Sequence, residues 1–395
     1  MIYLTRAIES SIRNQLTRGK SILLLGARQT GKTTLIKQID PTLSLSFIYP
    51  NIRQRYEKSP DNLRNEILAL PSKNGRPIVA IDEVQKIPQM MDVIQGIIDE
   101  NLAQFILSGS SARKLRHGTK VNLLPGRLVV FHLDPFSLEE MQQPYASIES
   151  LILDGSLPSI FLTPNERDRE IDLQSYVTTY LEEEIRAEAV VRQIGTFSRF
   201  LEWAASEAGQ IINLTKLSQQ IGVSHSTISS YYQILEDCLI VERVEAYTNS
   251  STRHRLTKSP RYLFFDMGVR RLCAGEGRGM SEKQFGHLFE HFVGIELLRR
   301  LRTTSAKLHF WRDPSGPEID WLIVQDKKLT PIEVKWTDSP SDRDCRHLRL
   351  FLEEYPQSEQ GYIICRTPRR MNLGNKITAI PWQDIHQVVD SPLDL

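Results

Sequence analysis

A short apolar run followed by a glycine-rich loop constrains the fold of this chain more than any other feature. Residues 21–25 (SILLL) have the length and composition of a buried strand, and residues 26–33 read GARQTGKT. A strand, such a loop and a helix beginning near Lys32 form a cradle in which main-chain N–H groups surround a phosphate. This order predicts an α/β nucleotide-binding domain, and a plain glycine turn is the alternative.

Most positions of the loop have an expected role. Gly26 and Gly31 let the main chain turn and approach a phosphate, Lys32 reaches the β- and γ-phosphates, and the Thr33 hydroxyl can hold Mg2+. We therefore expect ATP and Mg2+ as cofactors. The predicted ATP-binding residues are Gly26, Ala27, Arg28, Gln29, Thr30, Gly31, Lys32, Thr33 and Thr34.

Two acidic residues follow a second apolar run, residues 77–81 (PIVAI). The run is typical of a strand buried on both faces of a parallel sheet, and ligands bind at the carboxyl ends of such strands. We expect Asp82 to hold Mg2+, directly or through water. Glu83 is expected to orient and deprotonate the attacking water, which favours an ATP hydrolase over a kinase. A solvated acidic turn is the alternative.

Two more polar positions adjoin strand-like runs. Ser108 follows residues 104–107 and could contact the γ-phosphate; Ser110 is a close alternative, and ordinary turn chemistry explains both. Arg127 precedes the apolar residues 128–131. It could stabilise charge on the phosphoryl group bound by a neighbouring subunit, or be a surface arginine. The predicted catalytic residues are Lys32, Glu83, Ser108 and Arg127.

These motifs resemble those of an AAA-type P-loop ATPase family (AAA_14-like) of bacteria and archaea whose members carry a C-terminal DUF4143 region. The similar segments are residues 26–34, 81–88, 107–111, 126–127, 155–158 (GSLP) and 176–181 (YVTTYL), the last two in the family's lid region. The resemblance covers nearly the whole chain. It implies an AAA+-like ATPase core over residues 1–145 and a helical lid over residues 146–200.

Residues 214–241 have the pattern of a helix-turn-helix, the centre of an expected winged helix-turn-helix over residues 201–262. Gly222 breaks the first helix and Ser224 is a good N-cap for the second. A polar helix face could lie in the major groove of DNA, and a basic hairpin could bind the DNA phosphates. Winged helices also serve as protein-docking modules. The outer face lacks Arg and Lys, so strong sequence specificity is not expected. The predicted DNA contacts are His225, Ser226, Thr227, Ser229, Arg253, Arg255 and Lys258.

A second group of candidate site residues lies on two expected strands of the C-terminal third, residues 318–324 and 331–336. Glu333 and Lys335 are two apart and share a strand face, and Asp320 faces them if the strands pair in register. Two carboxylates and a lysine form a plausible Mg2+ site for phosphodiester hydrolysis.

This pattern resembles the PD-(D/E)xK nuclease superfamily, with Glu290 as the acid on the preceding helix. The resemblance implies a C-terminal α/β restriction-endonuclease-like domain over residues 263–395, with Glu290, Asp320, Glu333 and Lys335 as its site. Two alternatives remain open: an exposed hairpin with ordinary salt bridges, and a nuclease fold that binds DNA without cutting it.

Composition limits the cellular setting. The chain has 395 residues, of which 40% are hydrophobic, so it can bury more than one core. Its apolar runs are strand-sized, its N-terminus lacks the pattern of a signal peptide, and its 4 cysteines lack metal-ligand spacing. We expect a cytoplasmic protein without a membrane partner. The net charge of +1 means that any DNA contact depends on local patches or a ring interior.

The sequence as a whole predicts a DNA-associated ATPase. It would couple Mg-ATP hydrolysis to the binding and remodelling of DNA, including branched DNA, as a homo-oligomeric ring, a hexamer. An ATP-gated, metal-dependent DNA nuclease in genome defence or repair is the first alternative. A nucleotide-dependent switch that binds proteins is the second.

Overall fold

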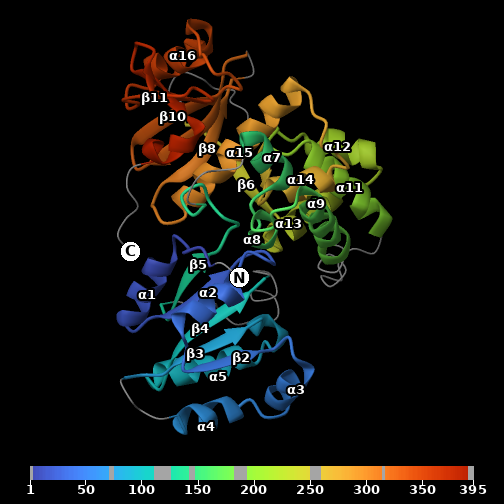
Figure 1. The fold of residues 1–395 in the computed structure, drawn as a ribbon, viewed down its shortest axis with the longest axis vertical. Helices are drawn as coiled ribbons and strands as arrows, with labels where there is room; N and C mark the ends of the chain where they lie inside the picture. The colour runs from blue at the N-terminus through green and yellow to red at the C-terminus, as the bar shows by residue number, and fades with distance from the viewer. Residues whose placement is uncertain are drawn as a thin grey trace. The chain divides into compact units, whose positions relative to one another are not determined.

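The computed structural model describes residues 3–70, 75–110, 126–141, 147–181, 194–249, 259–313 and 316–389. Contacts divide the chain into two compact units (Figure 1). The described residues of unit 1 lie within 1–136 and 237–240, and those of unit 2 lie within 137–236 and 241–389. Each unit has its own sheet. The four-part division expected from the sequence stays a prediction.

Unit 1 is built on a five-stranded sheet in the order β2-β3-β4-β1-β5. Every neighbouring pair is parallel, which requires a crossover between successive strands. The strands are β1 (Ser21–Leu25), β2 (Leu43–Ser46), β3 (Ile78–Asp82), β4 (Gln104–Gly109) and β5 (Leu128–His132). The α/β class and the parallel sheet predicted from the sequence are confirmed.

Helices cover both faces of this sheet. Along β1, Leu23 packs into one buried apolar cluster, whereas Ile22 and Leu24 pack into another. This alternation explains why β1 and β3 read as continuous apolar runs. The helices of unit 1 are α1 (Glu9–Thr17), α2 (Lys32–Ile39), α3 (Pro50–Lys58), α4 (Asn62–Leu68) and α5 (Met90–Asp99), with the short 3-10 helix η1 (Val84–Lys86).

Unit 2 contains an eight-stranded sheet in the order β12-β13-β11-β10-β9-β8-β6-β7. It mixes parallel and antiparallel pairs. The strands are β6 (Val241–Ala246), β7 (Arg261–Phe264), β8 (Lys307–Arg312), β9 (Glu318–Gln325), β10 (Lys328–Val334), β11 (Gly361–Cys365), β12 (Met371–Asn372) and β13 (Ile377–Pro381).

Most described helices of the chain belong to unit 2. The α-helices are α7 (Ile148–Asp154), α8 (Pro158–Phe161), α9 (Glu166–Ser175), α11 (Ile194–Ser206), α12 (Leu214–Ile221), α13 (His225–Asp237), α14 (Met267–Cys273), α15 (Glu282–Leu301) and α16 (Arg346–Glu354). The other helical segments are the π-helix η2 (Tyr176–Leu181) and the 3-10 helices η3 (Asp342–Cys345) and η4 (Trp382–Val388). In the described part of the chain, no helix is both long and apolar enough to cross a membrane.

The expected helix pair is present as α12 and α13. Gly222 ends α12 in the left-handed conformation, with a φ of 79°, and Ile228, Tyr232 and Leu235 of α13 are buried. The β6–β7 hairpin that follows is antiparallel, but β6 also pairs with β8. The hairpin is therefore part of the larger sheet, and the winged helix stays a prediction. Arg253, Arg255 and Lys258 lie outside the described residues.

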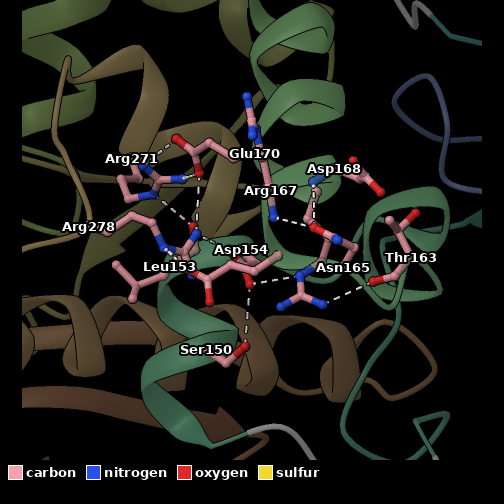
Figure 2. A network of polar contacts seen from close by, with 12 residues as sticks. Ser150, Leu153, Asp154, Thr163, Asn165, Arg167, Asp168, Glu170, Arg271 and Arg278 are labelled. Carbon is pink, nitrogen blue, oxygen red and sulfur yellow. Dashed lines mark hydrogen bonds and ion pairs between the residues drawn. The ribbon is translucent and has the colours of Figure 1, made fainter.

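A network of ion pairs fastens the helices α7 and α9 to the segment around α14 (Figure 2). Asp154, with 5% of its side chain exposed, accepts bonds from Arg169 Nε at 3.0 Å and Arg278 Nη1 at 2.5 Å. Glu170 pairs with Arg271 and with Arg278. Because buried charges are costly unless paired, this network makes the packing of these helices depend on a few side chains.

Candidate functional site

The loop between β1 and α2 has the shape that its sequence predicts. Gly31 has a φ of 96°, in the left-handed region, and α2 begins at the next residue, Lys32. A Cβ atom on Gly26 would lie 2.4 Å from the Leu133 carbonyl oxygen and 2.9 Å from Thr30 Oγ1. Both glycines are therefore needed, one for its conformation and one for the close approach of neighbouring atoms.

Arg6 fixes this loop, although the sequence analysis did not single it out. Its Nη1 donates to the Thr30 carbonyl oxygen at 2.7 Å, and its Nη2 donates to the Asp134 carbonyl oxygen at 2.6 Å. The guanidinium also lies over the Phe136 ring, 5.0 Å from its centroid. Arg6 therefore ties the loop to the segment after β5. No local pattern in the sequence indicates such a long-range contact.

Lys32 lies inside the cradle. Its Nζ donates to the carbonyl oxygens of Gly26 at 2.8 Å and Ala27 at 2.9 Å. Thr30 Oγ1 also donates to the Ala27 carbonyl oxygen, at 2.9 Å. Of the other predicted ATP-binding residues, Gln29, Thr33 and Thr34 are exposed and Arg28 is half-buried. The loop thus buries its lysine and leaves polar side chains of the next turn accessible.

The two predicted Mg2+ ligands lie next to each other. Thr33 Oγ1 donates to Asp82 Oδ2 at 3.1 Å, although the residues are 49 positions apart. Ser108 Oγ donates to the other oxygen, Asp82 Oδ1. Because Mg2+ prefers oxygen ligands, a hydroxyl and a carboxylate at the end of a phosphate-binding loop fit that ion.

Glu83 lies beside this pair in a left-handed conformation, with a φ of 56°. Its Oε2 accepts hydrogen bonds from Gln85 Nε2 at 2.5 Å and from Ser110 Oγ at 3.2 Å. The structure thus separates the two serines that the sequence left open, since Ser108 contacts Asp82 and Ser110 contacts Glu83. The sequence analysis did not identify Gln85 as a site residue. The one feature of the sequence that could have indicated it is its position two residues after Glu83.

Arg127 lies beside the start of β1, at the opposite end of that strand from the loop. Leu128, the next residue, pairs with Ser21 at the start of β1, whereas the loop follows Leu25 at the end of β1. Arg127 forms two hydrogen bonds with Asp99, of 2.5 and 3.0 Å, which lower the pKa of that carboxyl group. Arg127 is therefore not beside the loop of its own subunit, and a role across subunits stays a prediction.

The C-terminal residues Asp320, Glu333 and Lys335 come together on the β9–β10 hairpin. Ile332 pairs with Trp321, the register that the sequence analysis required. Lys335 Nζ lies 2.5 Å from Glu333 Oε2 and 3.8 Å from Asp320 Oδ2. Asp320 Oδ2 also accepts a bond of 2.8 Å from the main-chain N–H of Val334.

Glu290 joins this group from α15, and the carboxylates affect one another. Burial, and then the charge of Asp320, raises the pKa of Glu290 to about 7 and raises that of Glu333 well above its usual value. Burial lowers the pKa of Lys335, but the surrounding carboxylates outweigh it and the net shift is upward. The Glu333 side chain is 2% exposed, and its Oε1 has no hydrogen-bond partner.

A buried carboxylate oxygen without a hydrogen-bond donor, beside two further acids, raises the question of a metal site. Within the described ranges, however, no three acidic, His or Cys side chains are grouped so that they could hold a metal ion. The carboxylates are instead paired with cationic side chains: Glu333 with Lys335, and Glu290 with Arg261. The predicted nuclease-like residues are thus assembled, but not as a set of metal ligands.

The predicted DNA-contacting residues of α13 are accessible. His225, Ser226 and Ser229 are exposed, and Thr227 is half-buried. The Ser224 hydroxyl accepts from the main-chain N–H of Thr227 at 3.1 Å, as an N-cap does. The helix therefore presents a polar face without Arg, Lys, Asp or Glu at its N-terminal end.

Comparisons with known proteins give matches along the chain. Family models match residues 18–142 to an AAA domain, residues 145–278 to a domain of unknown function (DUF8612) and residues 285–385 to another (DUF4143). An uncharacterized protein of Mycobacterium tuberculosis is 27% identical over 393 residues, 98% of this chain and 85% of the relative. One of Haemophilus influenzae is 24% identical over 359 residues, 84% of this chain and 86% of the relative.

Solved structures give weaker likenesses. The Bacillus subtilis DNA clamp loader delta protein aligns with a TM-score of 0.28 and 11% identity, over 58% of this chain and 87% of that one. Cdc6p from Pyrobaculum aerophilum aligns with a TM-score of 0.28 and 12% identity, over 69% and 94%. The family matches confirm the AAA-domain and DUF4143 parts of the resemblance: this chain joins a region similar to AAA domains to regions similar to two domains of unknown function.

Proposed function

We propose that this chain is an ATP hydrolase that uses Mg2+ at the loop between β1 and α2. The observation that carries the proposal is the 3.1 Å contact between Thr33 Oγ1 and Asp82 Oδ2. It joins the loop to the end of β3, and these are the two oxygen groups that would hold Mg2+ beside a phosphate. The match of residues 18–142 to an AAA domain supports the proposal.

The surrounding side chains have distinct tasks in this reaction. Lys32 would turn its ammonium group from the loop carbonyls to the β- and γ-phosphates. Bound Mg2+ would neutralise charge on the phosphate oxygens. Ser108, which donates to Asp82 Oδ1, keeps the carboxylate oriented so that Oδ2 faces Thr33.

Glu83 is the proposed general base. Gln85 and Ser110 both donate to its Oε2, which fixes the carboxylate and leaves Oε1 to take a proton from water. The left-handed main chain at Glu83 costs energy for a residue other than glycine, and such strain is often found at functional sites. These contacts support a catalytic role over a solvated acidic turn.

We further propose that hydrolysis is coupled to the binding and remodelling of DNA, including branched DNA, in a hexameric ring. The exposed polar face of α13, with His225, Ser226 and Ser229, supports a DNA contact without strong sequence preference. Arg127 supports the ring. It is 35% exposed and lies at the opposite end of β1 from its own loop, so any phosphate it serves belongs to a neighbour.

DNA-stimulated turnover tests this coupling. Phosphate release from Mg-ATP would be measured without DNA and with single-stranded, duplex and four-way-branched DNA. We expect severalfold stimulation by one DNA form, and we expect it to fall as salt rises because phosphate contacts release counterions. Unchanged turnover, together with no salt-dependent DNA affinity, would contradict the DNA proposal and favour a switch that binds proteins.

An ATP-gated DNA nuclease in genome defence or repair is the second candidate. The observation that favours it is Glu333 Oε1, a buried carboxylate oxygen without a partner beside Asp320 and Lys335. Gel analysis of the same DNA in Mg2+ separates the two candidates. If the protein is a nuclease, the wild type cuts the DNA. The Asp320→Asn variant then loses this cleavage but still hydrolyses ATP. Intact DNA with wild-type protein would contradict it.

A further inference from the structure

The side-chain amide of Gln85 is bound at one end only. Its Nε2 donates to Glu83 Oε2 at 2.5 Å and to Ser110 Oγ at 3.4 Å, so both amide hydrogens are used. Its Oε1 is buried, and none of the residues that the structure describes donates a hydrogen bond to it. Gln85 and Glu83 are each 7% exposed, and Ser110 is 1% exposed. A buried acceptor therefore lies beside the proposed general base.

The orientation of this amide follows from its neighbours. An ionised carboxylate only accepts hydrogen bonds, so the NH2 end of Gln85 must face Glu83. Ser110 Oγ donates its hydrogen to Glu83 Oε2 at 3.2 Å, which leaves its lone pairs to accept from Gln85 Nε2. The three side chains thus form a closed set of hydrogen bonds. Turning the amide over would place Oε1 against the carboxylate, where two acceptors repel each other.

The main chain holds Gln85 in this position. Glu83 has a left-handed conformation, and the 3-10 helix η1 begins at the next residue. The main-chain N–H of Lys86 donates to the Glu83 carbonyl oxygen at 3.0 Å and closes the turn. Val84 and Ile87, on either side of Gln85 in the sequence, are fully buried in the apolar cluster on one face of the sheet. The turn therefore keeps the Gln85 side chain beside Glu83.

We propose that Gln85 is a further catalytic residue, whose Oε1 accepts a hydrogen bond from the water that attacks ATP. The proposal rests on the ATP hydrolase proposed above. Two hydrogen bonds through one water span about 5 Å, and Oε1 belongs to the same amide as Nε2, which lies 2.5 Å from Glu83 Oε2. One enclosed water can therefore contact both Gln85 and Glu83. A buried acceptor without a donor costs free energy, so a water that donates to it is bound favourably.

The two side chains have distinct roles in the reaction step. The water oxygen bonds to the γ-phosphorus while one of its protons passes to Glu83 Oε1. The bond from this phosphorus to the bridging oxygen breaks, and its electron pair leaves on ADP. Gln85 Oε1 accepts from the second O–H of the water, which turns a lone pair of the water toward phosphorus. Glu83 thus takes the proton, and Gln85 orients the nucleophile.

Binding of transition-state analogues tests this role. ADP with aluminium fluoride mimics the phosphoryl group under attack by water, whereas ADP with beryllium fluoride mimics ATP before the attack. In the full chain with Mg2+, Gln85→Met should lower kcat by about tenfold or more. It should weaken the binding of ADP–aluminium fluoride by a similar factor, because the contact is strongest in the transition state. The affinity for ADP–beryllium fluoride should stay at the wild-type value.

Two further variants complete the test. Gln85→Lys keeps a donor for Glu83 Oε2 but has no acceptor, so it should be as slow as Gln85→Met, and it stands in for that variant if the methionine protein does not fold. Gln104→Met is the matched control. Gln104 is 8% exposed, and its Nε2 donates to the Leu16 carbonyl oxygen at 2.7 Å. It pairs with Ile78 at the start of β3, whereas Glu83 follows the end of that strand, so this variant should keep the wild-type kcat.

The outcomes distinguish the role of Gln85 from the hydrolase itself. Slow turnover and weak binding of ADP–aluminium fluoride in the Gln85 variants support the contact with water. Wild-type turnover in Gln85→Met, or its recovery in Gln85→Lys, overturns the contact and leaves the hydrolase standing. Equal losses of affinity for the two fluoride complexes also overturn it, because they indicate a general loss of nucleotide binding. No turnover by the wild-type protein with any DNA form overturns the hydrolase, and with it the role of Gln85.

Discussion

Replacing Glu83 by glutamine is expected to lower the kcat of ATP hydrolysis by about 10²–10⁴-fold, the usual contribution of a general base. Glutamine keeps the shape of the side chain and can still accept hydrogen bonds from Gln85 and Ser110 through its carbonyl oxygen. It cannot take a proton from water. The affinity for ATP should stay close to that of wild type, because Glu83 is not among the loop groups that would surround the phosphates.

The measurement is steady-state phosphate release, with binding of a fluorescent ATP analogue measured on the same preparations. Glu100→Gln is the matched control, because Glu100 is an acid of unit 1 that pairs with Arg64 on the exposed surface. This variant should hydrolyse ATP as wild type does. If Glu83→Gln retained wild-type turnover, the attacking water would need another base, and the proposed role of Glu83 would be wrong.

Replacing Asp154 by alanine is expected to lower the free energy of unfolding by about 1–3 kcal/mol, because it removes a buried acceptor from two partly buried guanidinium groups. Asp154 accepts from Arg169 and Arg278, and both arginines would lose a partner inside the packed helices (Figure 2). Arg278 also bonds Glu170, so part of the network would remain. Chemical denaturation, followed by circular dichroism, gives the change in the free energy of unfolding.

Glu166 supplies the control for this prediction. It pairs with Arg278 Nε at 2.8 Å, but 63% of its side chain is exposed. Glu166→Ala should therefore cost only about 0–1 kcal/mol, as is usual for solvent-exposed ion pairs. Equal losses in the two variants would show that burial of Asp154 does not set the strength of the network.

The elements around the loop could be predicted because their signals are local. Residues 21–25 and 77–81 are continuous apolar runs because both faces of those strands are covered by helices. The two glycines of the loop predict the turn between strand and helix. The order of the strands could not be predicted in this way. It depends on pairings such as Ile22 with Ile106, which lie far apart in the sequence.

The same division applies to the candidate site. Lys32, Thr33, Asp82 and Glu83 were predicted because each lies beside a strand end with a recognisable pattern. Side chains that reach the site from elsewhere leave no local signal. Arg6, 24 residues before the loop residue that it holds, is one of these.

The β9–β10 hairpin shows which contacts can be predicted from the pairing of two strands that are adjacent in sequence. Asp320, Glu333 and Lys335 were expected to share a face, and they do, because a short turn sets the pairing of β9 with β10. Glu290 comes from a distant helix, and its partner could not be anticipated. Arg261 meets it only because β7 joins the same sheet through β6 and β8.

The most direct test of the account is phosphate release from ATP by the wild-type chain, with Mg2+ present and after its removal by a chelator. The account predicts steady turnover that requires Mg2+, because Thr33 and Asp82, which contact each other, are its proposed ligands. Turnover that persists without a divalent ion, or no turnover with Mg2+ and each DNA form, would contradict a hydrolase at this loop.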